Sequence, residues 1–247
     1  MAGKKVSEDR WKQALAWESS LWESIEHKRG WKRPIWMIAR PFFRLLGLPG
    51  GAKDDFNHWW EKQLDFYNYL PKEISNYIEL GCGPYTNTRL ILKERKAKHI
   101  ILSDPLIRNY IRYRRTWLAR QYKTGAICID PNPAENCLYA DGTFDVVVMI
   151  NVLDHVMDVD QCLSNAIRIA RKGGFFIFGQ DLTDEEGLRR FPYDVGHPIR
   201  LNLEEIEPYL TGFQPVLRKV LSREEGRAPE AHYGTLLFVG RKTENSK

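Results

Sequence analysis

The sequence lacks the features of several large protein classes. Its 247 residues contain only four cysteines, with no CxxC pair and no histidine-flanked pattern, so it predicts neither a disulfide framework nor a zinc finger. No apolar run approaches the roughly 20 residues that a membrane-spanning helix requires. The opening MAGKKVSEDR has no apolar core, so we expect no signal peptide. We expect the cysteines to be buried free thiols, as in proteins of a reducing compartment, and this favours the cytoplasm.

The composition is that of a globular protein with a hydrophobic core. Hydrophobic residues make up 43% of the chain and aromatic residues 12%, and the length suits one domain with elaborations. The net charge of +5 is concentrated in two basic clusters interleaved with aromatics, at residues 28–44 and 108–123. Such clusters could attract phosphate, an anionic lipid surface or nucleic acid, or could be solvated helix faces.

Apolar segments of strand length alternate with helical segments from residue 77 onward. The strand candidates are Tyr77–Leu80, His99–Ser103, Ala126–Ile129, Phe144–Ile150 and Gly174–Gly179. The helical candidates between them are Thr86–Arg95, Leu106–Tyr122 and Val159–Ala170. This order is typical of right-handed βαβ units around a parallel sheet. After a polar stretch, the sequence predicts a short helix at Leu203–Leu210 and a closing hairpin-type pair at Val216–Leu221 and Gly234–Val239.

The N-terminal part of the chain differs in composition. Seven of the eight tryptophans lie in the first 76 residues, and Trp11–Glu26 and Asp55–Leu70 read as amphipathic helices. We expect residues 1–72 to form a helical cap over the ligand-binding edge of the domain at 73–247. Residues 30–51 mix aromatic and cationic side chains, and Pro34 and Pro41 should limit any continuous helix there. This stretch could contact a membrane interface or a lipid-linked acceptor, or could be a packed lid.

Two glycines one residue apart follow the first strand, in IELGCGP. Gly81 and Gly83 allow a backbone to approach a ligand that a β-carbon would exclude. A dinucleotide fingerprint would have a third glycine where Thr86 stands. Asp104 ends the next strand, where a carboxylate can accept hydrogen bonds from ribose hydroxyls. Glu79 would repel a pyrophosphate but suits a cationic amino-acid tail.

The chain resembles class I S-adenosylmethionine-dependent methyltransferases of the small-molecule type. The motifs that carry the resemblance are IELGCGP, LSDP and AENCLYADGTFDVVVMINVLDHVMD, and together they cover roughly residues 75 to 180. The resemblance implies an α/β fold with a mostly parallel, Rossmann-like seven-stranded sheet, helices on both faces and an antiparallel last strand. It also implies S-adenosylmethionine as cofactor and S-adenosylhomocysteine as product.

The resemblance also assigns the cofactor site residue by residue. Glu79, Gly81 and Gly83 would line the methionine part, and Cys82 between the glycines would also bind the cofactor. Asp104 would hold the ribose hydroxyls, Leu106 would lie against the adenine, and Pro105 between them would also bind the cofactor. Ala134 and Glu135 would border the adenine edge, and Asn151 and Val152 would stand behind the sulfonium. Where many relatives have an aspartate for the adenine amino group, this sequence has Pro133, so Glu135, Asn132 or a backbone carbonyl would have to substitute.

Two histidines are the candidate catalytic residues. His155 follows the fourth strand and His197 lies in the loop after the fifth, and an imidazole that titrates near neutrality suits removal of a proton from an alcohol. Each could also have a structural role, at a helix start or in a turn. Asp154 and His155 could belong to a metal site, but without a clear third ligand the sequence predicts none.

The acceptor is predicted only as a class. The Asn/Asp-Pro-Pro-aromatic signature of enzymes that methylate base amines is replaced here by Asn151-Val152-Leu153-Asp154, which argues against nucleic acid. We therefore expect O-methylation of a small-molecule or glycan-type acceptor, which could be lipid-linked. An N-methyltransferase, an RNA-modifying enzyme and a non-catalytic nucleoside-binding module are the alternatives.

Overall fold

The computed structural model describes residues 4–45, 58–63, 69–226 and 234–244, and for residues 28–45 of the first helix it describes the backbone alone. Seven strands form one sheet in the order β3-β2-β1-β4-β5-β7-β6. Their bounds are β1 Glu73–Leu80, β2 Lys96–Ser103, β3 Cys128–Asp130, β4 Phe144–Ile150, β5 Ala170–Leu182, β6 Phe213–Leu221 and β7 Gly234–Lys242. β1 to β5 are parallel, and β7 is antiparallel to β5 and β6. The predicted mostly parallel sheet and closing antiparallel pair are confirmed.

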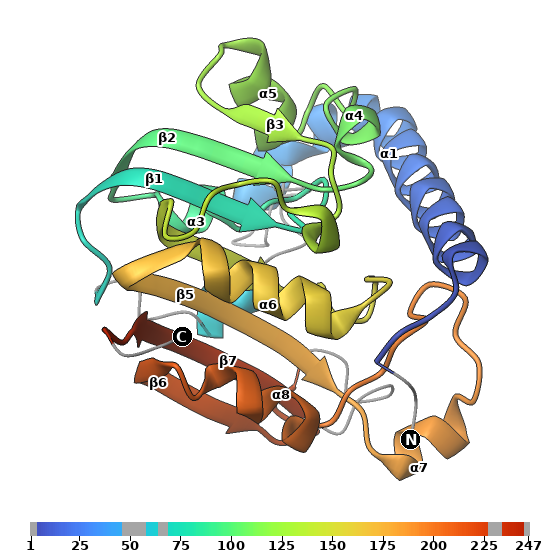
Figure 1. Cartoon of the computed structure of the whole chain (residues 1–247). Coiled ribbons are helices and arrows are strands. Elements are labelled where there is room, and N and C mark those ends of the chain that lie inside the picture. The colour runs from blue at the N-terminus through green and yellow to red at the C-terminus, as the bar shows by residue number, and fades with distance from the viewer. Residues whose placement is uncertain (1–3, 46–57, 64–68, 227–233, 245–247) are drawn as a thin grey trace.

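Helices cover both faces of this sheet (Figure 1). Their bounds are α1 Glu8–Leu45, α2 His58–Gln63, α3 Thr88–Ile91, α4 Ile107–Tyr110, α5 Trp117–Lys123, α6 Val159–Ile169, α7 Glu185–Arg190 and α8 Leu203–Leu210, with a 3₁₀ turn η2 at Ala134–Asn136. Alternate residues of β4 face opposite layers, since Val147 packs towards α6 and α8 and Val148 towards α4 and α5. This double burial explains the unbroken apolar character of β4.

Two predicted helices are shorter in the structure. Thr86–Arg95 contains only the single turn of α3, and Leu106–Tyr122 divides into α4 and α5. The division has a local cause, because the Thr116 hydroxyl accepts a hydrogen bond from the Ala119 amide and so begins a new helix. The polar stretch after β5, for which no helix was predicted, contains α7, whose first turn is capped by Asp184.

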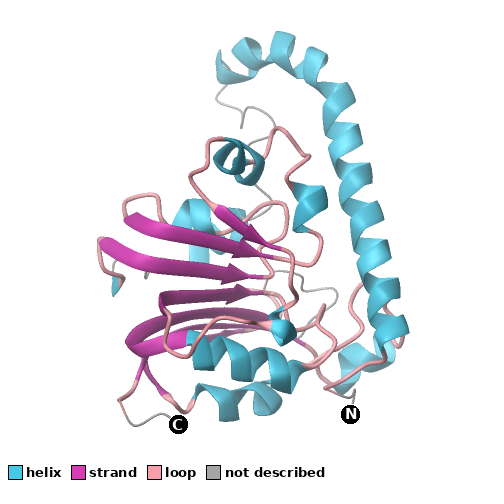
Figure 2. Cartoon of the chain, turned by 45° about the horizontal axis from the view of Figure 1, so that its top comes forward, coloured by secondary structure: helices cyan, strands magenta, loops and turns pink. Residues whose placement is uncertain are grey.

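The long helix α1 crosses the edge where the parallel strands end (Figures 1 and 2). Its backbone continues through Pro34 and Pro41 to Leu45, so the prediction that these prolines limit a continuous helix is wrong. A proline removes one backbone hydrogen bond and bends a helix without necessarily ending it, and Figure 2 shows α1 changing direction in its C-terminal half. The division into a cap at 1–72 and a domain at 73–247 stays a prediction.

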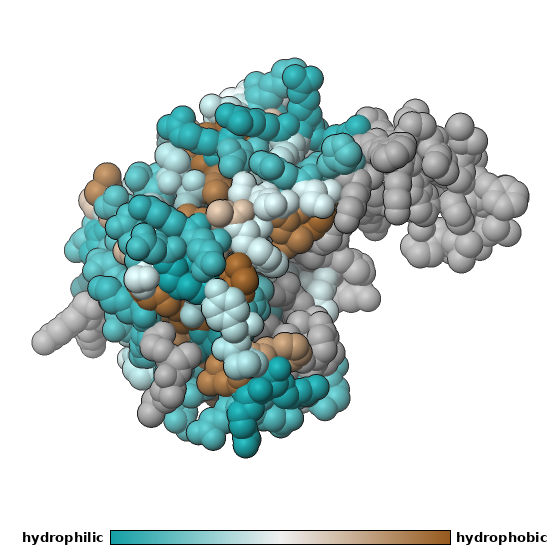
Figure 3. Space-filling view, turned by 90° about the vertical axis from the view of Figure 1, so that its right-hand side faces the viewer, coloured by the Kyte–Doolittle hydropathy of each residue, from teal (hydrophilic) through white to brown (hydrophobic). Residues whose placement is uncertain are grey.

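Residues 30–51 were predicted to form either a packed lid or a membrane contact, and neither alternative is tested. The side chains of this stretch lie outside the described residues, as do residues 46–57 altogether. No helix in the described ranges is long and apolar enough to cross a membrane. Figure 3 faces the side on which α1 lies and shows small hydrophobic patches scattered among hydrophilic side chains. Trp17 and Leu21 of α1 are partly exposed, each at 38%.

Candidate active site

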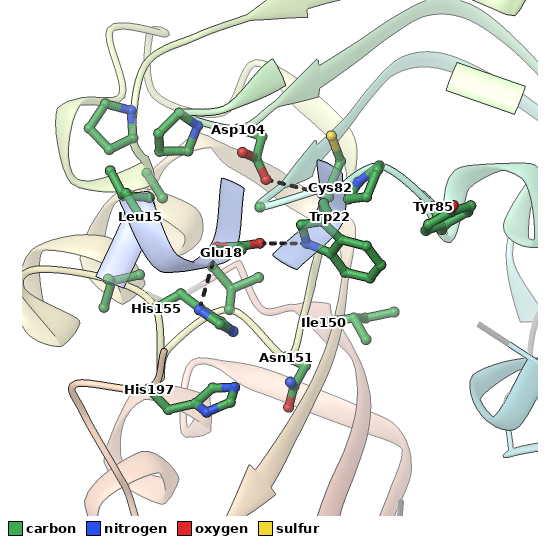
Figure 4. Close-up of a pocket in the computed structure, with 18 of the residues that line it drawn as sticks. Leu15, Glu18, Trp22, Cys82, Tyr85, Asp104, Ile150, Asn151, His155 and His197 are labelled. Atoms are coloured by element: carbon green, nitrogen blue, oxygen red, sulfur yellow. Dashed lines mark hydrogen bonds and ion pairs between the residues drawn. The ribbon is translucent and has the colours of Figure 1, made fainter. Parts of the chain in front are cut away.

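A cavity of about 420 Å³ lies beneath α1 at the carboxyl ends of the parallel strands. Its walls come from the turns after β1, β2, β3 and β4, from the N-terminal half of α1, from Trp60 of α2 and from His197 (Figure 4). The strand order of the sheet reverses at this point, because β1 is flanked by β2 on one side and by β4 on the other. Ligands of open α/β sheets bind at such a reversal.

The two positions after β1 require glycine for different structural reasons. Both have positive φ angles, +64° at Gly81 and +57° at Gly83. A β-carbon at Gly81 would lie 2.6 Å from Cγ2 of Val152, so this glycine allows the turn to pack against the end of β4. A β-carbon at Gly83 would meet no atom within 4 Å, which leaves the backbone open to the cavity. Between them, Cys82 lies on the cavity wall, and burial raises the pKa of its thiol.

Glu79 lies beneath this turn and holds it in place. Its side chain is 1% exposed, and its carboxylate accepts hydrogen bonds from the hydroxyls of Thr86 and Thr88 and from the amides of Asn87 and Thr88. Burial raises the pKa of the Glu79 carboxyl, and these donors oppose the shift. The carboxylate is thus engaged within the turn, and its contact with a cofactor stays a prediction.

Asp104 joins the turns after β1 and β2. Its carboxylate accepts a hydrogen bond from the Gly83 amide at 3.0 Å and from the Leu106 amide at 2.8 Å. Burial, and then the negative charge of Glu18, raise the pKa of the Asp104 carboxyl to about 7. Pro105 lies on the cavity wall, whereas Leu106 packs, half-buried, against the core on that side of the sheet.

The turn after β3 forms the adjoining wall, with Asn132, Pro133, Ala134 and Glu135. The Glu135 carboxylate accepts hydrogen bonds from the amides of Met157 and Asp158, so it also orders the loop that leads into α6. The Ala134 carbonyl accepts from the side-chain amide of Asn165 at 3.0 Å. These contacts fix the wall beside Asp104 to the loop that carries His155.

Asn151 directly follows β4 and has a left-handed backbone conformation. Its φ of +56° is unusual for a residue other than glycine and is found preferentially at functional sites. Its amide donates to the Gly179 carbonyl at 2.7 Å, and its side-chain oxygen accepts from the Asp181 amide at 3.2 Å. These bonds to β5 hold Asn151 and the adjoining Val152 at the cavity wall.

The fold brings together the two predicted catalytic histidines, which are far apart in sequence. The ring centroids of His155 and His197 are 4.7 Å apart. His155 Nε2 lies 3.9 Å from Asp154 Oδ1, and His197 Nε2 lies 4.0 Å from Asp154 Oδ2. On its other side, His197 Nδ1 lies 2.8 Å from Oδ2 of Asp194, a contact that lowers the pKa of the Asp194 carboxyl.

Helix α1 adds a carboxylate that the sequence analysis missed. Glu18 Oε1 accepts hydrogen bonds from Trp22 Nε1 at 3.2 Å and from the Tyr110 hydroxyl at 3.0 Å. Its Oε2 lies 3.6 Å from His155 Nδ1. Figure 4 shows Glu18 between Asp104 and His155. One carboxylate therefore faces both ends of the cavity.

The N-terminal part of α1 also fixes the two histidine loops. The Trp11 indole donates to the His155 carbonyl at 3.0 Å, and the Arg10 guanidinium donates to the carbonyls of Val195 and Asp194. The Trp17 ring lies edge-on to the His197 ring. The predicted cap thus forms part of the site.

Residues 78–178 match the model of a family described as a methyltransferase domain. The matched span runs from β1 to β5 and includes the glycine turn, Asp104 and the end of β4. Residues 78–178 thus carry the sequence of a methyltransferase domain, and the comparisons support the class I, S-adenosylmethionine-dependent type. Its sheet, with β7 antiparallel, is the one that this family has.

Related proteins support this assignment. A Mycolicibacterium smegmatis protein described as a probable S-adenosylmethionine-dependent methyltransferase is 26% identical over 182 residues, which cover 71% of this chain and 66% of that protein. The N-methyltransferase NodS of Bradyrhizobium japonicum, solved with S-adenosylhomocysteine, has a TM-score of 0.58 at 22% identity, over 77% of this chain and 90% of NodS. The Burkholderia thailandensis 1,6-didemethyltoxoflavin-N1-methyltransferase has a TM-score of 0.57 at 15% identity, over 97% and 92% of the two chains. Likeness at these identities shows the fold.

The methyltransferase site has the features that S-adenosylmethionine requires. The backbone at Gly83 is open to the cavity, and its predicted contact with the amino-acid tail of the cofactor stays a prediction. The Asp104 carboxylate lies at the cavity with a backbone donor on each oxygen, and lone pairs remain for two ribose hydroxyls. Residues 132–135, Asn151 and Val152 also line the cavity, and their predicted places beside the adenine and behind the sulfonium stay predictions.

Sequence reasoning missed Glu18, Asp194 and Trp60 of this methyltransferase site. Glu18 had a visible signal, since it stands within the apolar stripe that Trp11, Ala14, Trp22 and Ile25 form at helical spacing. A carboxylate at such a position is costly to bury unless it has partners. Trp60 had no comparable signal, because only the folded chain brings it to the cavity, and Asp194 acts through His197, three residues further along the same loop.

Proposed function

We propose that this methyltransferase domain methylates a hydroxyl group of a small molecule. When bound, S-adenosylmethionine supplies a methyl group on a positively charged sulfur. The observation that carries the proposal is the group of His155, His197 and Asp154 at one end of the cavity that holds Gly83 and Asp104. An alcohol must lose its proton to attack the methyl carbon, and this cluster supplies imidazole nitrogens where that proton leaves.

The contacts of His197 support such a role. With Nδ1–H donating to the Asp194 carboxylate, the neutral ring presents the lone pair of Nε2 towards Asp154. The Asp194 side chain also accepts from the amides of Gly196 and His197, which orders the loop that carries the ring. Because the ring is already held in one tautomer and one orientation, it loses little conformational entropy when it takes up a proton from the acceptor.

The rest of the cavity favours an aromatic or otherwise planar acceptor of modest size. Side chains of Trp11, Trp17, Trp22 and Trp60 contribute to the walls, and flat apolar surfaces pack well against rings. The cavity of about 420 Å³ also has to hold the cofactor, which limits the acceptor. This makes a small molecule the better proposal than a nucleic acid or a glycan polymer.

N-methylation is the second candidate. NodS and the toxoflavin enzyme are both described as N-methyltransferases. Glu18 and Asp154 place two carboxylates beside the histidines, and carboxylates attract an ammonium group. Such an acceptor would still have to lose a proton before it could attack.

A methyl-transfer assay tests the proposal and separates the two candidates. The purified full chain is incubated with methyl-labelled S-adenosylmethionine and matched pairs of phenols, aliphatic alcohols and amines, and products are identified by mass spectrometry. Methylated oxygen in a phenol or alcohol supports the proposal. Methylation confined to the amines replaces it with the second candidate, and no transfer to any class in the presence of bound cofactor contradicts both.

A further inference from the structure

The side chains at the acceptor end of the cavity have the composition of a cation site. We propose that Asp154, His155 and His197 bind one divalent transition-metal ion, with Zn²⁺ as the reference ion. One ligand atom from each residue lies within 4.8 Å of the other two. Two imidazoles and a carboxylate are a common ligand set for catalytic zinc and related ions, which keep further positions open for water or substrate. The sequence alone showed no third ligand, and the fold brings His197 to that place.

The distances suit an ion with a small adjustment of side chains. The Nε2 atoms of His155 and His197 lie 3.9 and 4.0 Å from the two oxygens of Asp154. Metal–ligand bonds of about 2.0–2.2 Å place neighbouring ligand atoms about 3–3.6 Å apart. Side-chain rotations that bring each histidine closer to Asp154 by about 1 Å or less, and the two histidine nitrogens, which lie within 4.8 Å, closer by at most about 2 Å, therefore complete the site. Asp154 is held in the interior, at 5% exposed, whereas the two rings are partly accessible from the cavity.

His197 has the hydrogen-bonded outer carboxylate that metal-bound histidines have, and His155 faces a second carboxylate at a longer distance. A ligating imidazole donates its second ring N–H to a carboxylate or carbonyl, which fixes the nitrogen that faces the metal. His197 Nδ1 lies 2.8 Å from Asp194, and His155 Nδ1 lies 3.6 Å from Glu18. Each ring therefore turns Nδ1 towards an outer carboxylate and Nε2 towards Asp154, which base catalysis by one histidine would not require of both.

In the reaction, the ion would act on the acceptor, and this part of the inference rests on the proposed function. With both Nε2 lone pairs on the ion, neither ring would take the proton itself, so the ion would replace the histidines in that role. A hydroxyl bound in an open coordination position would lose its proton to solvent more readily, because the positive ion would stabilise the oxyanion. The oxyanion attacks the methyl carbon, a C–O bond forms, and the C–S bond breaks with its electron pair going to sulfur. The products are the methyl ether and S-adenosylhomocysteine, and no oxidant or reductant is consumed.

Metal binding is tested without any acceptor. The tag-free full chain is treated with a chelator, dialysed and titrated with Co²⁺, whose visible absorption reports the ligand geometry, and then with Zn²⁺ in competition. We expect saturation at one ion per chain and loss of at least about 10-fold in affinity for His197→Ala and Asp154→Asn. Asp194→Asn should weaken binding through the outer shell, whereas His99→Ala, at an exposed histidine of β2, should change nothing.

The outcomes separate this inference from the proposed function. Absence of saturable binding, or one-to-one binding that His197→Ala and Asp154→Asn leave unchanged, overturns the metal site. Binding of S-adenosylhomocysteine by each variant confirms that it is folded. Full methyl transfer by the chelated protein, with no gain on adding Zn²⁺, overturns the role of the ion and leaves the methyltransferase proposal intact. Saturable metal binding with no transfer to any acceptor supports the site and counts against the proposed function.

Discussion

At the scale of single residues, the site is organised by carboxylates with different surroundings. Asp104 is buried and accepts hydrogen bonds from two backbone amides. Glu79 accepts its hydrogen bonds from within the turn after β1, and Asp194 pairs with the His197 imidazole. Glu18 faces both Asp104 and His155, although it comes from the far N-terminal helix. A carboxylate can therefore bind a ligand, hold a turn in place or shift the pKa of a neighbouring group, depending on its burial and on its hydrogen-bond donors.

The raised pKa of Asp104 predicts a pH dependence of stability. Its carboxyl has an ordinary pKa of 3.8 and a folded-state pKa of about 7. The folded protein keeps this proton where the unfolded chain has lost it, so this group lowers the unfolding free energy as pH rises from about 4 to about 7. Asp104→Asn should remove that component, and urea unfolding of both proteins at about pH 4.5 and about pH 7.5 measures it. An equal pH dependence in the two proteins contradicts the prediction.

The two histidines are predicted to act in turnover and not in cofactor binding. His197→Ala or His155→Ala should reduce turnover by about 100-fold or more, with S-adenosylhomocysteine affinity nearly unchanged. Part of the lost rate should return at higher pH, where the acceptor ionises without help. Steady-state rates across pH measure both effects, with exposed His99→Ala as the matched control. Wild-type rates in both variants would show that positioning alone suffices.

At the scale of elements, the turn after β1 was recognisable from the sequence, but its inner construction was not. The pattern IELGCGP, followed by Asp104 at the end of the next strand, predicted the turn and its ligand edge. The hydrogen bonds of Glu79 to Thr86 and Thr88 depend on a fold that shortens the following helix to a single turn. Periodicity predicted the long apolar strands well, because their burial on both faces leaves a strong signal.

The two glycines of this turn should respond differently to the same change. Alanine at either position is strained by the positive φ, at about 1–2 kcal/mol. Gly81→Ala also collides with Val152, so it should lose more unfolding free energy. Gly83→Ala has space for its β-carbon but projects it into the open cavity, so it should mainly weaken S-adenosylhomocysteine binding. Urea unfolding and calorimetric titration of both variants measure the contrast, and identical behaviour would contradict it.

At the scale of the whole molecule, α1 completes a site that the α/β domain begins. The sequence predicted a Trp-rich helix over the ligand edge, but not which side chains would reach the cavity. That information depends on the docking of α1 to loops at residues 155–158 and 194–197, through contacts such as Trp11 to His155 and Arg10 to Val195. Contacts so distant in sequence leave no local pattern.

The docking of α1 gives a prediction of its own. A β-carbon at Gly196 would overlap the Trp17 ring, so Gly196→Ala should push α1 away from the His197 loop and reduce turnover. Cofactor affinity should fall less, since Asp104 and Gly83 are remote from this contact. Adding Trp17→Ala should relieve the overlap, so the effects of the two changes on turnover should not add. Strict additivity in this double-mutant cycle would show that the contact does not transmit the effect.

The measurement that tests the central claim most directly is calorimetric titration of the full chain with S-adenosylhomocysteine. The account predicts one saturable site in the wild type. Asp104→Ala should weaken it by about 1–3 kcal/mol, because two ribose hydroxyls lose their acceptor, and Asp9→Ala, at an exposed carboxylate of α1, should not. Absence of binding by the folded wild type, or equal affinity in Asp104→Ala, would contradict the assignment of this cavity to S-adenosylmethionine.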